Sequence, residues 1–526
     1  MRSEEGTPAP GTVYLIGAGP GDPGLLTIKG RRRIRDADVV VYDYLANPQL
    51  LSEAKDGTEI IYVGKRGSDH TAEQAQINEL LVAKAREGKT VARLKGGDAF
   101  IFGRGGEEAL FLAEHDIPFE IVPGVTSAYA VPAYAGIPVT HRGLASDVAF
   151  ITGHEQRADG TPDIAWEMAA KSTGTLVFLM GVKNLPLIVD RLVANGKPAG
   201  TPVAVVRWGT LADQETLTGT LGDITEKVRG RDFHPPAVIV VGDVVRLREK
   251  LAWFEKKPLF GRRVIVTRAA GQVGSLGRAL EEAGAEIIDF PTIAIEPIDD
   301  TAPIDGALAD MAAGKPFEWT IFTSANGVDF FFANARRAGY DARILGGSRI
   351  AVVGTATAAA LADFGLTPDL VPSDFRAEGL VDEFRRLDVA DKRILLPRAK
   401  EGREILPAAL REIGAEVVVA PVYRNVPAKP PVEPVKEALA AGRVGFTTFT
   451  SGSTVKNFVS LLGADGDLPE LMSKTRIAVI GPVTAKSAAK CGLTVDVMPE
   501  VSTIPALVEA IKKWVTGDGG RGTKSE

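Results

Sequence analysis

The sequence predicts an α/β protein, and three observations support this fold class. Short apolar runs rich in Val and Ile recur at the length of buried strands, with segments of helical periodicity between them. Most of these runs are followed by Gly, Ser or Thr, as is typical of buried parallel strands that lead into helices. The chain has 526 residues, so at about 150 residues per domain we expect roughly three or four compact units. The expected strands cover residues 13–17, 38–42, 175–180, 202–206, 237–242, 263–268, 349–354, 393–398 and 476–481.

A domain junction is expected near residue 258. Between residues 245 and 263 the alternation of strands and helices stops in a charged stretch that contains Pro258 and Gly261. We therefore expect one domain over residues 12–250 and a second over 262–513. The ends of the chain, residues 1–11 and 516–526, are expected to be flexible tails.

The charge balance limits the classes of partner. The 61 basic and 67 acidic residues give a formal net charge of −6, which argues against sequence-independent binding of nucleic acid or of an anionic membrane. No apolar run approaches the length of a membrane span, and the N-terminus has no apolar signal region. An anionic ligand would therefore have to meet a local basic patch.

Cysteine and histidine usage argues against a metal or disulfide scaffold. Cys491 is the single cysteine, so we expect a cytoplasmic protein in which this side chain is a buried apolar residue. All five histidines precede residue 235 and lack the spacing of metal ligands. No metal site is expected.

The second half contains an internal repeat, which predicts two equivalent α/β lobes. Ligands of parallel sheets bind at the carboxyl ends of strands, so the polar residues repeated there indicate a cleft between the lobes. Thr323, Ser324, Thr450 and Ser451 could cap helices or contact a ligand, and both can hold together. The aligned pairs are 264–291 with 394–421, 319–332 with 446–459, and 350–372 with 477–499.

The run GAGPGD (17–22) is similar to the start of a dinucleotide-binding fingerprint, with Asp43 where a ribose-binding acid would lie. However, Asp22 replaces the third glycine, and Pro23 follows where the helix should begin. These departures argue against nicotinamide binding. An NAD-binding oxidoreductase nevertheless stays an alternative for the first half.

Glycine-rich and polar motifs follow the expected strands of the first half. They are VYLIGAGPGDPGLLTIKG (13–30), VVVYDYL (39–45), VGKRGSDH (63–70), RLKGGDAFIFGRGGEE (93–108), VPGVTSA (122–128), AGIPVTHRG (135–143), FLMGV (178–182), VRWGT (206–210) and PPAVIVVGDVV (235–245). As an ordered set covering nearly all of residues 12–248, they closely resemble uroporphyrinogen-III C-methyltransferase, of the tetrapyrrole methylase family.

This resemblance implies a two-lobed tetrapyrrole methylase fold and a homodimer. It also implies two methyl transfers from S-adenosylmethionine, as co-substrate, to uroporphyrinogen III, giving precorrin-2. A sulfonium methyl needs no acid to leave, so the enzyme must mainly align the carbon nucleophile with the donor and then remove a proton. The residues that the resemblance assigns to the cofactor are Pro20, Gly96, Gly97, Asp98, Ile101, Thr126, Ser127, Met180, Gly209 and Ala237.

The resemblance also assigns catalytic and substrate-binding residues. Asp43 matches the proposed proton acceptor and Lys65 the proposed proton donor, with Asp22 in support. From the residues alone, a helix cap at a strand end is the favoured role for Asp43. Because the substrate carries many carboxylates, we expect Lys65 to bind it together with Arg66, Arg104 and Arg142.

Four motifs of the second half carry a second resemblance: TSANGVDFF (323–331), PVYRNVP (421–427), TFTSGSTVKNF (448–458) and RIAVIGPVTAKSAAKCGL (476–493). With the duplicated lobes, they make residues 262–513 resemble uroporphyrinogen-III synthase. That family closes hydroxymethylbilane into a macrocycle, inverts the last ring and uses no cofactor. The resemblance implies one lobe from 262–294 plus 427–513 and another from 295–426.

Tyr423, matched through PVY, is the candidate that protonates or orients the departing hydroxyl. It could instead be a packed tyrosine, and Arg398, which repeats Arg268, could be ordinary surface charge. The proposed carboxylate binders at strand ends are Thr267, Arg268, Ser324, Asn326, Thr355, Thr450, Ser451 and Thr484.

We therefore expect a bifunctional tetrapyrrole enzyme whose second half supplies the substrate of the first. The alternative is a methyltransferase fused to a non-catalytic, two-lobed tetrapyrrole-binding module. Whether the product goes to sirohaem, cobalamin or another tetrapyrrole is left open.

Overall fold

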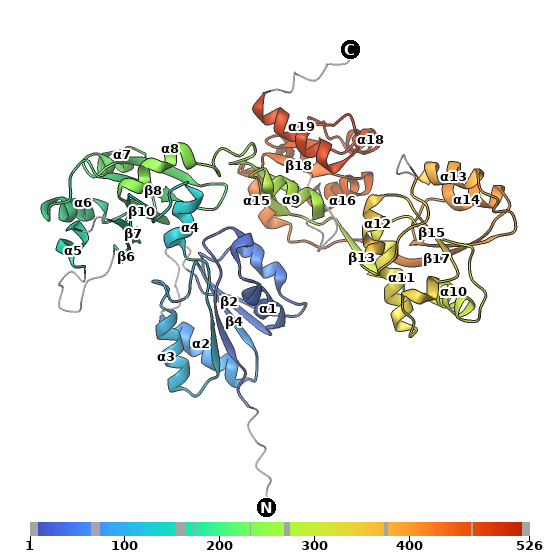
Figure 1. Ribbon diagram of the computed structural model, residues 1–526, viewed down its shortest axis with the longest axis horizontal. Coiled ribbons are helices and arrows are strands. Elements are labelled where there is room, and N and C mark those ends of the chain that lie inside the picture. The colour runs from blue at the N-terminus through green and yellow to red at the C-terminus, as the bar shows by residue number, and fades with distance from the viewer. Residues whose placement is uncertain are drawn as a thin grey trace, which may run out of the picture. The chain divides into compact units, whose positions relative to one another are not determined.

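The computed structural model describes residues 9–64, 74–153, 164–171, 174–231, 233–267, 274–372, 377–463 and 467–517. The chain divides into two compact units (Figure 1). The first contains Met1–Arg263 with the short segments Leu280–Glu286 and Val515–Asp518. The second contains Val264–Ala279, Ile287–Trp514 and Gly519–Glu526. The predicted tails lie mostly outside the described residues, and the last helix, α19 (Ile504–Thr516), extends past residue 513.

The first sheet of the first unit is parallel throughout. Its strand order is β3 (Glu59–Tyr62), β2 (Val39–Tyr42), β4 (Val91–Lys95), β1 (Val13–Gly17), β5 (Phe119–Val122). Alternate residues enter separate cores: Val13 and Val39 pack in one, and Ile16 and Val40 in the other. Burial on both faces explains why β1 and β2 are continuous apolar runs. The main helices are α1 (Ile28–Asp36), α2 (Gln74–Arg86) and α3 (Gly105–Glu114).

The loop after β1 departs from a dinucleotide-binding turn. Asp22 accepts a hydrogen bond from the Gly24 amide (2.7 Å) and caps the 3-10 helix η1 (Pro23–Leu25). The helix α1 begins only at Ile28, where Thr27 caps it. A pyrophosphate site requires a helix N-terminus directly after the strand. The local structure therefore gives the nicotinamide alternative no support.

The second sheet of this unit is mixed. Its order is β6 (Val148–Thr152), β7 (Thr175–Leu179), β10 (Ala237–Val241), β8 (Pro202–Arg207), β9 (Glu215–Thr220). Of the neighbouring pairs, β6 and β7 are parallel, whereas β10 is antiparallel to both β7 and β8, and β9 is antiparallel to β8. The prediction of parallel strands was thus wrong for residues 202–206 and 237–242. The associated helices are α4 (Ser127–Tyr134), α5 (Trp166–Lys171), α6 (Leu185–Ala194), α7 (Ile224–Gly230) and α8 (Arg248–Leu251).

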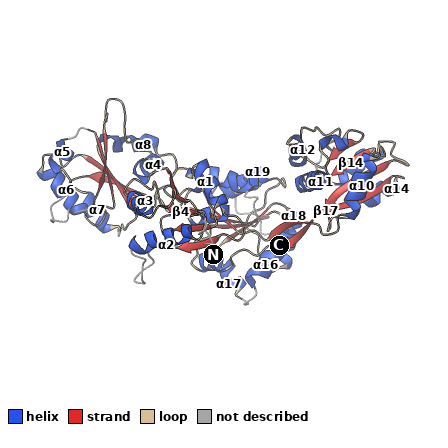
Figure 2. Cartoon of the chain, turned by 90° about the horizontal axis from the view of Figure 1, so that it is seen from below, coloured by secondary structure: helices blue, strands red, loops and turns tan. Residues whose placement is uncertain are grey.

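The second half contains two further sheets, and helices flank the strands of each (Figure 2). One has the order β12 (Glu286–Asp289), β11 (Arg263–Val266), β18 (Phe446–Phe449), β19 (Arg476–Val479). The other has the order β13 (Ile293–Pro297), β17 (Glu416–Pro427), β16 (Arg393–Ala399), β14 (Trp319–Phe322), β15 (Arg349–Val352), with only β13 antiparallel to its neighbour. Segments far apart in sequence therefore share the first of these sheets, while the second uses one continuous stretch.

Helices accompany both sheets of the second half. Those of the four-stranded sheet are α9 (Gly274–Glu282), α15 (Glu433–Ala440), α16 (Gly452–Leu462), α17 (Leu468–Met472), α18 (Pro482–Lys490) and α19. Those of the five-stranded sheet are α10 (Ala302–Ala312), α11 (Ala325–Arg337), α12 (Thr355–Ala362), α13 (Ala377–Arg385) and α14 (Ile405–Glu412). None of the helices described combines the length and the apolar character that crossing a membrane requires.

The internal repeat is visible in matched hydrogen bonds. The Asp369 carboxylate accepts from the Ile350 amide (2.7 Å), and Asp496 accepts from the Ile477 amide (2.8 Å). Ser324 and Ser451 cap α11 and α16 through the same side-chain bond. Residues at equivalent positions of the two lobes therefore form equivalent hydrogen bonds.

Candidate functional site

Two adjoining cavities lie in the first unit, at the carboxyl ends of β1, β2, β4 and β7. Their volumes are about 860 and 560 Å³. Both are lined by Tyr44, Leu45, Gly96, Gly97, Ser127, Leu179 and Met180. The ten predicted cofactor residues all line these cavities: Asp98, Ile101 and Thr126 the larger, Pro20, Gly209 and Ala237 the smaller, and Gly96, Gly97, Ser127 and Met180 both.

Glycines after β4 allow the backbone to form this wall. Gly97 has a φ of +70°, which favours glycine. A Cβ added at Gly96 would lie 2.3 Å from the Cβ of Leu45. Gly97 also exchanges backbone hydrogen bonds with Gly19 (2.7 and 3.1 Å), which joins the loops after β4 and β1. The glycine pair at 96–97 thus shapes the cavity through backbone geometry.

Left-handed backbone is concentrated around the cavities. Of the seven non-glycine residues with positive φ in the part of the chain described, three line the larger cavity and a fourth lines the smaller. A fifth, Thr210, accepts a hydrogen bond from the Asp22 amide. Non-glycine residues rarely adopt this conformation unless the surrounding structure imposes it, and such residues cluster at functional sites. The four residues of this kind that line the cavities are Phe102, Arg104, Met180 and Trp208.

Asp43 lies at the end of β2 on the wall of the larger cavity. Its Oδ1 accepts from the Leu45 amide (3.1 Å), and its Oδ2 accepts from Nη2 of Arg93 (3.2 Å). It caps no helix, since Asn47 caps the next 3-10 helix, Pro48–Glu53. Asp43 is therefore a partly exposed carboxylate held by an arginine beside the cavity.

Three charged residues that were not predicted as site residues lie behind Asp43. Arg93 and Lys95 on β4 and Glu108 on α3 are almost completely buried. Lys95 Nζ donates to Glu108 Oε1 at 2.7 Å. Burial lowers the pKa of Lys95, nearby Arg93 lowers it further, and Glu108 partly opposes both effects. The available signal was the pair of cationic residues within the otherwise apolar strand VARLK.

Asp98 and Thr126 already have structural partners. Asp98 accepts hydrogen bonds from the amides of Phe100 and Gly124, both at 2.8 Å. Thr126 caps α4 through the Ala128 amide (3.3 Å). These residues hold the loops that form the larger cavity.

Asp22 lines neither cavity. Its carboxylate accepts from the Tyr134 hydroxyl at 2.6 Å, and its amide donates to Thr210 Oγ1 at 3.0 Å. Burial, followed by the hydrogen bond to Asp22, raises the pKa of Tyr134 above its usual range. Asp22 thus links the loop after β1 to α4 and to the loop after β8.

The predicted basic residues are not all brought together. Arg104 lines the larger cavity, is 57% exposed and pairs with Glu107 at 2.6 Å. Arg142 is exposed and lines neither cavity. Lys65 and Arg66 lie outside the described residues.

In the second unit, Tyr423 within β17 contacts Ser324 at the start of α11. Their hydroxyl oxygens are 3.1 Å apart. Tyr423 is 6% exposed, and its ring stacks on Phe330. Burial raises the pKa of Tyr423, Ser324 lowers it, and Glu401 raises it slightly. The ring of Tyr423 is packed, as expected if this residue is an ordinary core tyrosine. Its hydroxyl, however, also has a polar partner in Ser324.

The predicted carboxylate binders differ in accessibility. Thr267 is 1% exposed and donates to the Thr448 carbonyl (2.8 Å), so its assignment as a carboxylate ligand does not fit this position. Thr484 is likewise buried at 4% exposure. Thr355 is exposed, while Ser324, Asn326, Thr450 and Ser451 are partly exposed. Arg268 lies outside the described residues.

Arg398 is not ordinary surface charge, because its side chain is 8% exposed. It pairs with Glu404 and donates to the Arg403 carbonyl (2.8 Å).

Cys491 caps α18 and is partly buried, not fully buried as expected. Among the described residues, no three His, Cys, Asp or Glu side chains gather as a metal site.

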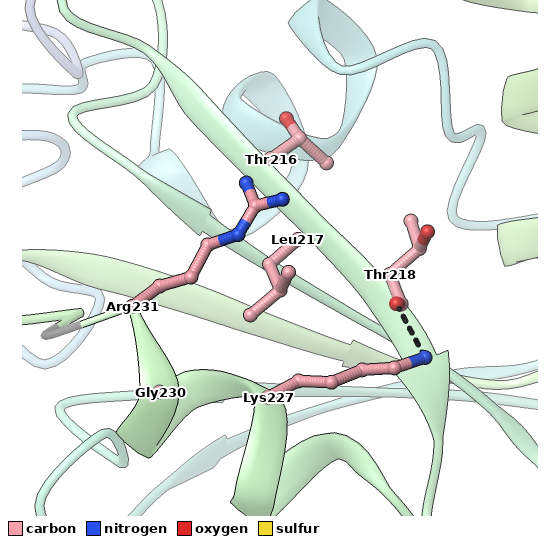
Figure 3. A pocket seen from close by; sticks show the side chains of 6 residues that line it. All are labelled: Thr216, Leu217, Thr218, Lys227, Gly230 and Arg231. Atoms are coloured by element: carbon pink, nitrogen blue, oxygen red, sulfur yellow. Dashed lines mark hydrogen bonds between the residues drawn. The ribbon is translucent and has the colours of Figure 1, made fainter.

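A third cavity, of about 500 Å³, lies between β9 and α7 (Figure 3). Lys227 donates there to the Thr218 carbonyl (3.3 Å) and pairs with Asp223 (2.8 Å). This cavity contains none of the predicted site residues. We therefore place the candidate site of the first unit at the two adjoining cavities.

Two family models match the chain, one on each half. Residues 12–225 match the model of Tetrapyrrole (Corrin/Porphyrin) Methylases, and residues 274–509 match that of Uroporphyrinogen-III synthase HemD. The porphyrin biosynthesis protein HemD of Ruminiclostridium josui is 38% identical over 501 residues, which cover 95% of this chain and 97% of the relative.

Other relatives match a smaller part. The uroporphyrinogen-III C-methyltransferase of Bacillus subtilis is 47% identical over 61% of this chain and 65% of its own length. The siroheme synthase of Pseudomonas fluorescens is 52% identical over 47% of this chain, which spans 53% of that relative.

Solved structures resemble each half separately. A Thermus thermophilus uroporphyrin-III C-methyltransferase complexed with S-adenyl homocysteine is 41% identical and has a TM-score of 0.39, covering 45% of this chain and 100% of its own. A mutant uroporphyrinogen III synthase from the same species is 21% identical and has a TM-score of 0.35, covering 49% and 99%.

Proposed function

The chain belongs to a family of porphyrin-biosynthesis proteins in which a tetrapyrrole methylase precedes a uroporphyrinogen-III synthase, and we propose that it converts hydroxymethylbilane into precorrin-2. The second half closes the linear substrate to uroporphyrinogen III. The first half methylates this product twice with S-adenosylmethionine. The observation that carries the proposal is the convergence of all ten expected cofactor residues on two adjoining cavities.

The residues of these cavities fit S-adenosylmethionine. Apolar side chains such as Val131 and Val206 line the smaller cavity and suit an adenosyl group. Gly96 and Gly209 face neighbours so closely that an added Cβ would lie 2.3 and 2.4 Å from side-chain carbons. When bound, the cofactor supplies an electrophilic methyl group on a sulfonium.

Two charged groups of the larger cavity support the proposal for a carboxylated tetrapyrrole. Arg104 faces it, and Asp43 lies on its wall with both oxygens hydrogen-bonded. After methyl transfer the ring must lose a proton, and Asp43 is the proposed acceptor. Lys65, Arg66 and Arg142 remain proposed substrate contacts by resemblance.

The test of the first half is methylation of supplied uroporphyrinogen III by the full chain. We expect dimethylated product with S-adenosylmethionine, and a thermal shift with this ligand but not with NAD. The Asp43→Asn variant should bind the cofactor normally but methylate slowly. No methylation by the unaltered protein would overturn this part of the proposal.

For the second half, the contact between Tyr423 and Ser324 supports a role at the departing hydroxyl. The phenol can donate to or orient that group while Ser324 fixes its position. Freshly generated hydroxymethylbilane without S-adenosylmethionine should give the type III macrocycle. If only the spontaneous type I product forms while the tetrapyrrole binds tightly, the second half is a binding module.

The oligomeric state and the cellular location are each proposed from one observation. We propose a homodimer through the first half, which exposes large apolar side chains such as Phe100, Leu110 and Tyr129. Light scattering during size-exclusion chromatography tests this. The proposed location is the cytoplasm, since the one cysteine forms no internal disulfide.

A further inference from the structure

Four charged side chains form a continuous network from the interior of the first unit to the larger cavity. Glu108 is 0% exposed, Arg93 2% and Lys95 4%, whereas the side chain of Asp43 is 26% exposed. Two of these groups are cations and two are carboxylates, so the network is formally neutral. Asp43, Arg93 and Lys95 all line the larger cavity.

Glu108 is the centre of this network. Its Oε1 accepts hydrogen bonds from Lys95 Nζ (2.7 Å), Gln74 Nε2 (3.1 Å) and Arg93 Nε (3.4 Å). The residue lies in the first turn of α3, where the helix dipole stabilises a carboxylate. All three donors bind the same oxygen, while the buried Oε2 accepts no hydrogen bond from the residues described. Three donors on one buried oxygen hold that oxygen and the groups that contact it in place.

Arg93 connects Glu108 to Asp43 by hydrogen bonds to both carboxylates. Its Nε donates to Glu108, its Nη1 to the Leu94 carbonyl (2.8 Å) and its Nη2 to Asp43 Oδ2 (3.2 Å). Three acceptors around one planar guanidinium set the orientation of its plane. Asp43 Oδ1 is held separately by the Leu45 amide. The direction in which Asp43 faces the cavity therefore depends on Glu108 through Arg93.

We propose that Glu108 is a positioning residue for methyl transfer, which orients the Asp43 carboxylate through Arg93 and balances the charge of Lys95 at the same cavity wall. The inference rests on the proposed role of Asp43. Glu108 does not line the cavity and acts only through its neighbours. If the ion pair of Glu108 and Lys95 served stability alone, it would need no connection through Arg93 to the Asp43 carboxylate at the cavity surface.

The test begins with Glu108→Gln, which keeps the shape and the acceptor oxygen but removes the charge. We expect kcat for methylation to fall about 10- to 100-fold, as small misplacements of a reacting group do. The Kd for S-adenosylmethionine should stay within about twofold, because no assigned cofactor contact is removed. A wild-type kcat in this variant would overturn the inference.

A double-mutant cycle separates positioning from general damage. If Glu108 acts through Asp43, adding Glu108→Gln to Asp43→Asn should change the single-turnover rate by less than about twofold. A full additional loss in the double variant would overturn the inference. If Asp43→Asn alone methylates at the wild-type rate, the proposed function of Asp43 fails instead, so the two failures are distinguishable.

Two further variants keep the test decisive. Glu59 pairs with Lys84 (2.7 Å) and Lys89 (3.2 Å) at the surface of the same sheet, so Glu59→Gln is a matched control that should leave kcat unchanged. If Glu108→Gln does not fold, Arg93→Lys keeps the charge balance but loses the three-acceptor geometry. It should show the same fall in kcat and the same lack of additivity with Asp43→Asn, and a wild-type kcat would overturn the inference.

Discussion

The hydroxyl of Tyr423 lies 3.1 Å from that of Ser324. Ser324 also caps α11 by accepting from the Gly327 amide (3.0 Å). Ser451 occupies the equivalent position in the other lobe and caps α16 in the same way, but it contacts Ser453 in place of a tyrosine. The two lobes are thus structurally alike and chemically different at matched positions.

Replacing Tyr423 by Phe should reduce formation of the type III macrocycle about 10- to 100-fold without abolishing it, because positioning of the substrate remains. The measurement is the initial rate of ring closure with hydroxymethylbilane, with isomers separated. Tyr340→Phe is the matched control, since Tyr340 packs against the same core. An unchanged rate in Tyr423→Phe would remove the hydroxyl from the mechanism.

Ser324→Ala and Ser451→Ala should each lower the free energy of unfolding by about 1 kcal/mol, the usual contribution of a helix cap. Only Ser324→Ala should couple to Tyr423→Phe in a double-mutant cycle of ring closure, because residues in contact are non-additive. Urea unfolding and ring-closure rates measure the two effects. Equal coupling of both serines to Tyr423 would contradict the asymmetry of the lobes.

Gly96→Ala should weaken binding of S-adenosylmethionine at least about tenfold, because the new methyl group must displace Leu45 from the cavity wall. Calorimetry measures the change in Kd. Gly106→Ala is the control, since an added Cβ there meets nothing within 4 Å. That control should retain affinity and gain a little stability, because alanine favours the helix α3.

Lys95 should make stability depend on pH. Its pKa in the folded protein is lowered from 10.5, with burial as the main cause. Between the lowered value and 10.5 the unfolded chain binds more protons, so this contribution to the free energy of unfolding rises with pH. Compared with Lys95→Met, the unaltered protein should therefore gain stability as the pH rises toward 10.5, the pKa of the unfolded lysine. Urea midpoints whose difference is constant over this range would contradict the prediction.

The sequence by itself determined nine of the strands that the structure describes and the positions of the proposed cofactor motifs along the chain. Strands such as β3 and β4 were not among those expected. The expected strands all appear as strands, because continuous runs of Val and Ile require burial on both faces. The motifs with Gly96 and Gly97 line the cavities because their positions follow directly from strand ends. Such features depend on local composition and on short-range geometry.

Only the tertiary structure decided strand direction and the partners of polar groups. An apolar run such as 237–242 is equally buried in a parallel or an antiparallel sheet, so periodicity could not show that β10 runs against β7 and β8. Thr267 is polar at a strand end, yet it bonds to a neighbouring strand and is buried. Arg93 and Glu108 are 15 residues apart and meet only because α3 packs beside β4. Hydrogen bonding and charge compensation between distant segments are set by packing, which no local pattern encodes.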